Sequence, residues 1–173
     1  MIYMVDHVFT DTALEPAWHE WYSGYLKKLI SVPGIHTAQR FRALGCTPSR
    51  FLAMYSIESA DVYTSDAYKG IGGGGSQSVR FHHAYQAWQR NLLEGLDRVP
   101  AVKEGQRVIV LDCRERSAEN PLGPSALWLK AVGLHMTTPY RSLVVLAAAE
   151  AATFKREAGS YLYEPFTAPL LAP

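Results

Sequence analysis

The stretch HEWYSGYLKKLISVPGIHTAQRF, His19–Phe41, contains a change of period that indicates the fold class. Before Pro33-Gly34, large apolar side chains recur every three or four residues, which predicts an amphipathic helix that begins near Glu15-Pro16. After this turn, residues 35–44 favour a strand. The apolar face of the helix consists of Trp18, Trp21, Tyr22, Tyr25 and Leu29. A long helix that turns directly into a strand is the first sign of an α+β chain.

The segments on either side extend this pattern to the order βαββαβ. A β-rich segment at 2–9 precedes the helix, and a second strand at 51–58 forms a hairpin with 35–44. Two further helices are predicted at 59–70 and 78–96, followed by an apolar strand at 106–113. In the helix at 78–96, the spacing would place one set of side chains on a single face: Phe81, Tyr85, Trp88, Leu92 and Leu96. This order predicts a ferredoxin-like unit with an antiparallel sheet at residues 1–113.

The last third contains a degenerate repeat of the second hairpin strand and of the helix that follows it. The pattern T-P-x-R-x-L begins at Thr47 and again at Thr138, each time before an apolar segment and an Ala-bearing helix. Residues 113–126 are polar and proline-rich, and we interpret them as a linker. Residues 114–173 are therefore predicted as a degenerate second half-repeat. Because one face of the first sheet needs cover, a barrel is expected, closed within the chain or by dimerisation.

The composition bounds the classes of partner. The 173 residues carry a formal net charge of +1, which predicts neither nucleic acid nor a membrane surface as a partner. The longest apolar run, SLVVLAAAEAA, is too short for a transmembrane helix, and the first residues do not resemble a signal peptide. The two cysteines form no disulfide framework. A cytoplasmic protein is the expectation.

The glycine run in YKGIGGGGSQSV, Tyr68–Val79, matches the letters of a dinucleotide-binding turn. That turn needs a strand directly before it, whereas here the preceding residues 59–70 favour a helix. We therefore expect no nucleotide at this site. Gly70 is interpreted as a left-handed helix end and the other glycines as a joint, which could act as a flap over a cavity beside Tyr68 and His82.

The helix-turn-strand stretch resembles the dimeric α+β barrel superfamily, in particular its EthD-like and stress-responsive members. The resemblance is carried by Trp21-Tyr22, Pro33-Gly34 and the strand residues 38–41, and it covers about residues 1–113. It implies a barrel and a homodimer. Relatives include cofactor-free oxygenases, cyclases, decarboxylases and proteins without known activity, so the resemblance does not choose a reaction. Relatives often have a His five residues beyond the helix Trp, where this chain has Leu26.

Two histidines are candidate catalytic residues. His82 and His19 both border an apolar helix face, where a His is either a structural group or a general base beside a pocket. No histidines, cysteines or acids stand at metal-ligand spacing, and no G-x-S-x-G occurs, so we predict no metal, no bound cofactor and no serine nucleophile. The candidate ligand-binding residues are Tyr22, Arg40, Tyr68 and Trp88.

Two functions follow from these residues. In the first, the barrel binds a small apolar or aromatic molecule and transforms it without a bound cofactor. In the second, it is a non-catalytic barrel with a structural or sequestering role. The aromatic surplus favours the first, and Leu26 in place of the family histidine favours the second. Arg40 and Arg42 share a sheet face and need water, a partner or an anionic ligand there. A solvated or dimer-facing pair is favoured over an anionic ligand.

Overall fold

The computed structural model describes residues 1–173 and shows eight antiparallel strands that close into a barrel. The order around the barrel is β2-β3-β1-β4-β6-β7-β5-β8, and β8 pairs with β2 to close it. A short ninth strand lies beside the other end of β2. The strands are β1 Ile2–Phe9, β2 Ile35–Ala43, β3 Ser49–Ile57, β4 Tyr85–Glu94, β5 Gln106–Cys113, β6 Leu127–Leu134, β7 Tyr140–Ala147, β8 Tyr161–Pro165 and β9 Leu170–Leu171.

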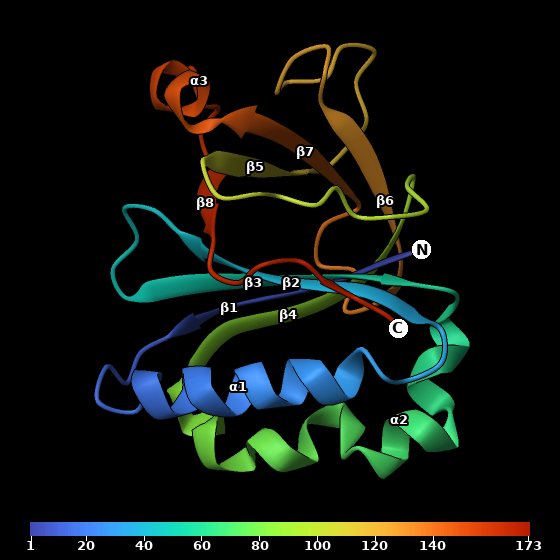
Figure 1. Ribbon diagram of the computed structural model, residues 1–173. Coiled ribbons are helices and arrows are strands. Elements are labelled where there is room, and N and C mark those ends of the chain that lie inside the picture. The colour runs from blue at the N-terminus through green and yellow to red at the C-terminus, as the bar shows by residue number, and fades with distance from the viewer.

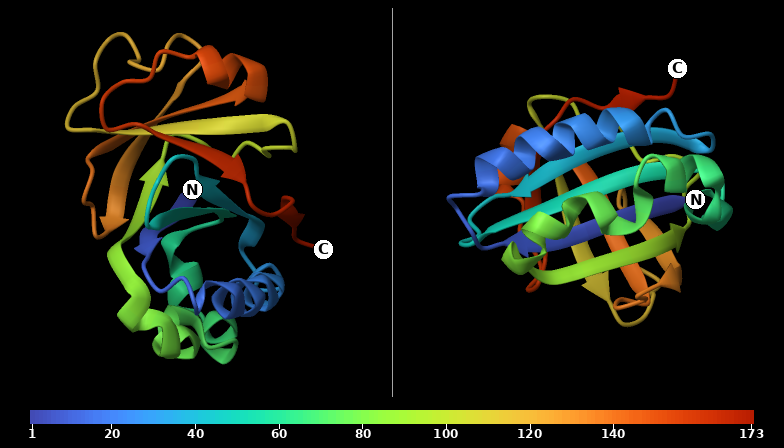
Figure 2. Two further views of the ribbon diagram at one scale, coloured as in Figure 1. Left: turned by 90° about the vertical axis from the view of Figure 1, so that its left-hand side faces the viewer. Right: turned by 90° about the horizontal axis from the view of Figure 1, so that it is seen from below.

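The helices lie outside the barrel and cover mainly one side of it. Figure 1 shows α1 and α2 below the strands β1–β4, with β5–β8 above them. The end-on view in Figure 2 shows both helical segments on the outer face of the first four strands. None of the helices is both long and apolar enough to span a bilayer. The helical segments are α1 Glu15–Leu29, the 3₁₀ segment η1 Ala60–Thr64, α2 Asp66–Gly70, the 3₁₀ segment η2 Gly73–Ala84 and α3 Ala148–Thr153.

Alternation along the strands builds two main cores. On β1, Ile2 and Met4 point into the barrel, where they join aliphatic side chains from both halves of the chain. Tyr3 and Val5 point outward and pack under α1 and η2. Each fully buried large side chain contributes roughly 1.5–3 kcal/mol to stability. Because side chains fill the barrel interior, the expected ligand cavity inside it is replaced by a mainly apolar core, which also contains the ion pairs of Asp6 with Arg50 and Arg141. The open space lies outside.

Most of the elements predicted for residues 1–70 are confirmed. The strand at 2–9, the hairpin and the aromatic face of α1 all form, and Glu15-Pro16 stand in the first helical turn. Asp11 does not cap α1 directly, because Leu14 is its N-cap residue. The Asp11 carboxylate instead accepts the N–H groups of Ala13 and Leu14 in the turn before the helix.

The predicted helix at 78–96 is wrong. Residues 73–84 form η2, and residues 85–94 form strand β4, which pairs with β1. The apolar residues of this segment fit a helical period, but neighbouring side chains also face opposite sides, as in a strand. Leu92 faces the helices and Leu93 faces the barrel interior. The free edge of β1 supplies hydrogen-bond partners that a helix would not use, so tertiary pairing overrides local preference.

The placement of the strand at 106–113 is also corrected. It was expected to complete the first sheet, but as β5 it pairs with β7 and β8 and belongs to the second half of the barrel. The predicted linker at 113–126 contains no helix and no strand, except that its first residue, Cys113, ends β5. It is followed by β6. The strands β6, β8 and β9 were not predicted from the sequence. The barrel is therefore closed within one chain.

The glycine run differs from its interpretation in one detail. Gly70 ends α2 without a left-handed backbone, whereas Gly72, Gly74 and Gly75 have φ values of 74°, 83° and 95°. The segment directly before the glycine run is the helix α2, as predicted, so the strand that a dinucleotide-binding turn needs is missing.

Candidate functional site

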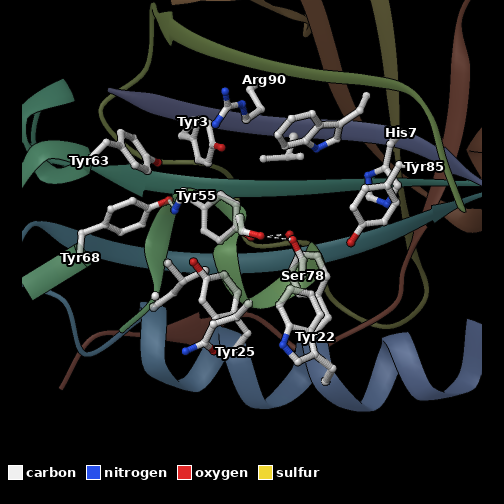
Figure 3. A pocket seen from close by; sticks show the side chains of 18 of the residues that line it. Tyr3, His7, Tyr22, Tyr25, Tyr55, Tyr63, Tyr68, Ser78, Tyr85 and Arg90 are labelled. Carbon is white, nitrogen blue, oxygen red and sulfur yellow. Dashed lines mark hydrogen bonds between the residues drawn. The ribbon is translucent and has the colours of Figure 1, made fainter. Parts of the chain in front are cut away.

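A cavity lies between α1, the glycine loop and the outer face of β1, β3 and β4. Figure 3 shows tyrosine side chains from the strands and from α1 that face one another across it. The space open to the centre of a water-sized sphere is about 70 Å³. One water needs roughly 10–15 Å³ by this measure, so the cavity has room for more than a single solvent molecule.

The cavity lining, called here the tyrosine cavity, contains seven tyrosines, two tryptophans, one histidine and one arginine. It contains no aspartate or glutamate. The full lining is Tyr3, Val5, His7, Trp21, Tyr22, Tyr25, Leu29, Ile35, Tyr55, Tyr63, Tyr68, Gly72, Gly74, Gly75, Gln77, Ser78, Tyr85, Trp88 and Arg90. Such a surface is suited to the faces and edges of aromatic rings.

A β-bulge in β4 brings Trp88 to the tyrosine cavity. Along the β1–β4 pair, Asp6 lies opposite Gln89 and Val8 opposite Gln86, so His7 is opposed by two residues. One of them, Ala87, has a φ of 49°, in the left-handed region. Bulges of this kind turn a strand locally and redirect the next side chain, here Trp88, which is 38% exposed.

The glycine loop closes another side of the cavity. The N–H of Gly74 donates a hydrogen bond to the hydroxyl of Tyr68 at 3.1 Å. A side chain at Gly73 would meet the ring of Tyr68, which lies against this glycine. The loop therefore holds Tyr68 in place and leaves its ring as part of the wall.

The hydroxyls of Tyr22, Tyr55 and Tyr85 remain protonated at neutral pH. Burial raises the pKa of Tyr85 to about 12 and raises the pKa of Tyr22 and Tyr55 above their usual value. Tyr22 and Tyr55 share a hydrogen bond between their hydroxyls at 2.8 Å, drawn in Figure 3. The Tyr85 hydroxyl accepts one from the indole N–H of Trp18 at 2.9 Å. The Tyr85 hydroxyl and one hydroxyl of the Tyr22–Tyr55 pair can therefore donate to a bound oxygen.

His7 is the buried titratable group of the site. It is 4% exposed, and neither ring nitrogen has a hydrogen-bond partner. Burial, with the charges of Arg40 and Arg50, lowers the pKa of His7 to about 3, so its imidazole is neutral at pH 7. A buried group without a partner is unfavourable, and here it offers one donor and one acceptor to a ligand.

Arg40 lies behind this wall. It is 1% exposed, and its guanidinium carbon lies 4.0 Å from the Tyr22 ring centroid and 4.5 Å from that of Trp18. It donates to Nδ1 of His19 at 3.0 Å, and Nε2 of His19 faces Glu15 at 3.3 Å. Burial and Arg40 lower the pKa of His19 to about 4. His19 therefore connects a buried cation to an acid.

The candidate residues fall into three groups. Tyr22, Tyr68 and Trp88 line the tyrosine cavity. Arg40 and His19 lie behind its wall and do not line it. His82 is solvent-exposed and does not line it either, but its Nε2 is 2.8 Å from the hydroxyl of Ser78, a lining residue. His82 is therefore at the rim, with its ring near those of Tyr85 and Trp88.

Sequence reasoning missed His7 and Arg90. The signal for His7 was present, since Tyr3, Val5 and His7 alternate along one strand and must share a face. Arg90 lies in the segment 78–96, which was predicted as a helix, and a helix would have placed it away from the face of Tyr85 and Trp88. No group of three His, Cys, Asp or Glu side chains stands close enough to hold a metal ion.

Comparison with known proteins gives matches of structure only. No protein-family model and no curated protein sequence matches the chain. The structure is similar to an "anthrone oxidase-like protein", with a TM-score of 0.59 and 11% identity over 99% of this chain and 93% of that one.

Two bacterial proteins named "putative monooxygenase" are also similar. The one from Lactobacillus acidophilus has a TM-score of 0.54 and 8% identity, over 99% of this chain and 96% of that one. The one from Fusobacterium nucleatum has a TM-score of 0.58 and 6% identity, over 96% and 92%. These likenesses show a shared fold, an antiparallel barrel with helices on its outside.

Proposed function

We propose that the protein binds a small aromatic molecule in the tyrosine cavity and oxidises it without a bound cofactor. The observation that carries the proposal is the lining itself: aromatic rings surround a neutral histidine that has no partner in the protein. Ring faces supply affinity for an apolar body, and the tyrosine hydroxyls and His7 supply the few polar contacts that orient it.

The names of the structural neighbours support an oxidation. A methylene group between aromatic rings, as in an anthrone, becomes a carbonyl when O₂ is reduced: one oxygen atom enters the product and the other leaves as water. Such a reaction begins with loss of a proton from the substrate. His7 is a neutral nitrogen base inside the cavity, and its low proton affinity limits it to acidic substrates.

The alternative is binding without turnover. Leu26 stands where the resemblance would place a histidine, and it is buried in the core under α1. This observation removes one expected catalytic group and leaves the cavity intact. A sequestering role would use the same lining and the same ligand class.

Binding and turnover can be tested separately. We expect 2-naphthol to quench tryptophan fluorescence saturably. The double variant Tyr22→Phe with Tyr55→Phe should weaken the binding of 2-naphthol. The control variant Tyr161→Phe, which lies outside the cavity, should leave this binding unchanged. Incubation with anthrone should consume O₂ in proportion to the quinone formed. Saturable binding without O₂ uptake for anthrone or related phenols would favour sequestration, and absence of binding would contradict both roles.

We further propose that the barrel consists of two ferredoxin-like units of the EthD-like type. Support comes from the strand orders β2-β3-β1-β4 and β6-β7-β5-β8, which correspond position by position. On this proposal the second unit begins at β5 and not at residue 114. Association into a homodimer, which the resemblance implies, is part of the same proposal, and sedimentation equilibrium tests it.

A further inference from the structure

We propose that Arg90 makes the tyrosine cavity selective for an aromatic molecule that carries an anionic oxygen. The inference rests on the proposed binding function and specifies its ligand class. It would assign Arg90 as the residue that pairs with a carboxylate or an ionised acidic hydroxyl. Neither the sequence pattern nor the structural neighbours assign this role.

Arg90 lacks the partners that a half-buried arginine normally has. Its guanidinium forms no ion pair and donates no hydrogen bond within the protein, and its Nε is fully buried without a partner. Its guanidinium stacks on the ring of Trp88, with 4.6 Å from the guanidinium carbon to the ring centroid. The stacking holds the planar group in position and leaves its N–H donors free.

Three other arginines of the barrel strands are paired with acids. Arg50 and Arg141 both pair with Asp6 inside the barrel. Arg42 pairs with Glu164 at 2.7 Å. Arg40 has no acid either, but it donates to His19 and does not line the tyrosine cavity. Arg90 is therefore the one arginine in the cavity lining, and its guanidinium has neither an acid nor a hydrogen-bond partner. A buried N–H donor without an acceptor is costly enough to call for one.

The charge of the cavity favours an anion at this place. Its lining contains no carboxylate, the imidazole of His7 is neutral at pH 7, and Arg90 is the only arginine or lysine among the lining residues. A second buried cation, Arg40, lies behind Tyr22 without a carboxylate in direct contact. In a site with restricted water these positive charges act with less screening than at the surface.

The strand register fixes how a ligand would lie. Arg90 is directly opposite Val5 on the outer face of the sheet, and His7 is two residues further along β1. Arg90 and His7 therefore flank a small aliphatic side chain. Figure 3 shows both pointing to the same side of the sheet as the tyrosines. A ligand with an anionic oxygen at Arg90 would lay its ring over Val5 and bring its far end to His7.

The test uses two ligands of nearly equal shape and different charge, 2-naphthoate and 2-naphthamide. With the full-length wild-type protein at pH 7.5, we expect naphthoate to bind at least tenfold more tightly in fluorescence titrations, as a charge-assisted hydrogen bond predicts. Arg90→Met should lower naphthoate affinity at least tenfold and leave naphthamide affinity within a factor of three. Arg90→Lys should retain part of the preference.

The control variant is Arg42→Met, which removes a cation outside the cavity and should leave both affinities unchanged. Thermal melts of each variant establish that the fold is retained. If naphthamide binds as well as naphthoate, or if Arg90→Met weakens both equally, the inference is overturned while the proposed aromatic binding survives. If neither compound binds and 2-naphthol does not bind either, the binding function itself is contradicted, and the inference with it.

Discussion

His7 couples the site to the stability of the fold. Its native pKa is about 3, below the value of 6.5 for an unperturbed histidine, so between these limits the unfolded chain binds a proton that the native protein does not. Stability is therefore complete above about pH 6.5 and falls as the pH falls toward 3. For one group the slope cannot exceed about 1.4 kcal/mol per pH unit.

We predict that His7→Leu lowers by up to one the number of protons that the chain takes up on unfolding at acid pH. Urea unfolding between pH 7.5 and pH 4.5 should show a shallower loss of stability than wild type. The remaining slope should include His19, whose pKa of about 4 gives it the same sign. At pH 7.5 the variant should unfold within about 1 kcal/mol of wild type, since an unpartnered polar group is replaced by an apolar one. Identical pH profiles would show that His7 is already protonated or solvated.

The two adjacent histidines of η2 allow a matched comparison. His82 contacts Ser78 and lies beside Tyr85 and Trp88, whereas His83 is 61% exposed and faces Asp11 at 3.7 Å. We predict that His82→Ala weakens binding of 2-naphthol severalfold and that His83→Ala does not, as measured by fluorescence titration. Equal behaviour of the two variants would place the binding site elsewhere.

At this scale the sequence predicts the type of site better than its members. Tyr22, Tyr68 and Trp88 were found because large aromatics in excess of a core's needs suggest a lined cavity. His7 was overlooked because nothing in the local sequence indicates what packs on the outer face of this strand. Only the packing of α1 over the outer face of β1 shows that His7 is buried.

Among the elements, the glycine loop holds the Tyr68 ring in its place in the cavity wall. A methyl group at Gly73 would lie 2.3 Å from the ring of Tyr68, whereas one at Gly70 meets nothing within 4 Å. We predict that Gly73→Ala displaces Tyr68 and weakens ligand binding by at least threefold. Gly70→Ala, in the ordinary backbone of α2, should leave binding unchanged and stabilise by up to about 1 kcal/mol.

Titration of both variants with 2-naphthol, together with thermal melts, checks this pair. Unchanged affinity in Gly73→Ala would show that Tyr68 does not contribute to the wall in solution. Loss of affinity in Gly70→Ala would show that the loop acts through α2 and not through the contact with Tyr68.

Element prediction succeeded where one period dominates and failed where two periods fit. α1 has an unambiguous stripe and a Pro-Gly stop, so its type and ends followed from the sequence. Residues 85–94 satisfy helical spacing and strand alternation together, and the choice depends on the free edge of β1, which no local pattern contains. The same reason explains why β8 and β9 were missed, because both are short and are held by distant partners.

Over the whole molecule, a charge network inside the barrel joins the two halves. Asp6 of β1 contacts Arg50 of β3 and Arg141 of β7, and Arg141 also donates to Asp112 of β5 at 2.7 Å. We predict that Asp6→Asn costs about 3–5 kcal/mol in urea unfolding, because the buried Arg141 and the partly buried Arg50 would both lose the charge of Asp6. The exposed pair Asp66–Lys69 supplies the control, and Asp66→Asn should cost no more than about 1 kcal/mol. Similar costs would mean that the network is open to solvent.

The expected division at residue 113 can be tested by expression. A fragment 1–113 would carry β5 without β7 and β8 and would expose the barrel side of β1 and β3, including Met4 and Leu52. We predict that this fragment is insoluble or dimerises through that face. A soluble monomeric fragment with a cooperative melt would contradict the prediction.

The loop at 114–126 stands where the second half would need a counterpart of α1. In a duplicated molecule with both helices, each half could cover its own cavity, and a barrel would hold two ligands related by a twofold axis. Here the second half has kept the strands that complete the barrel and has no such helix. The stoichiometry should then be one ligand per chain. The sequence of the second half is free to diverge, except where its strands pair with those of the first half.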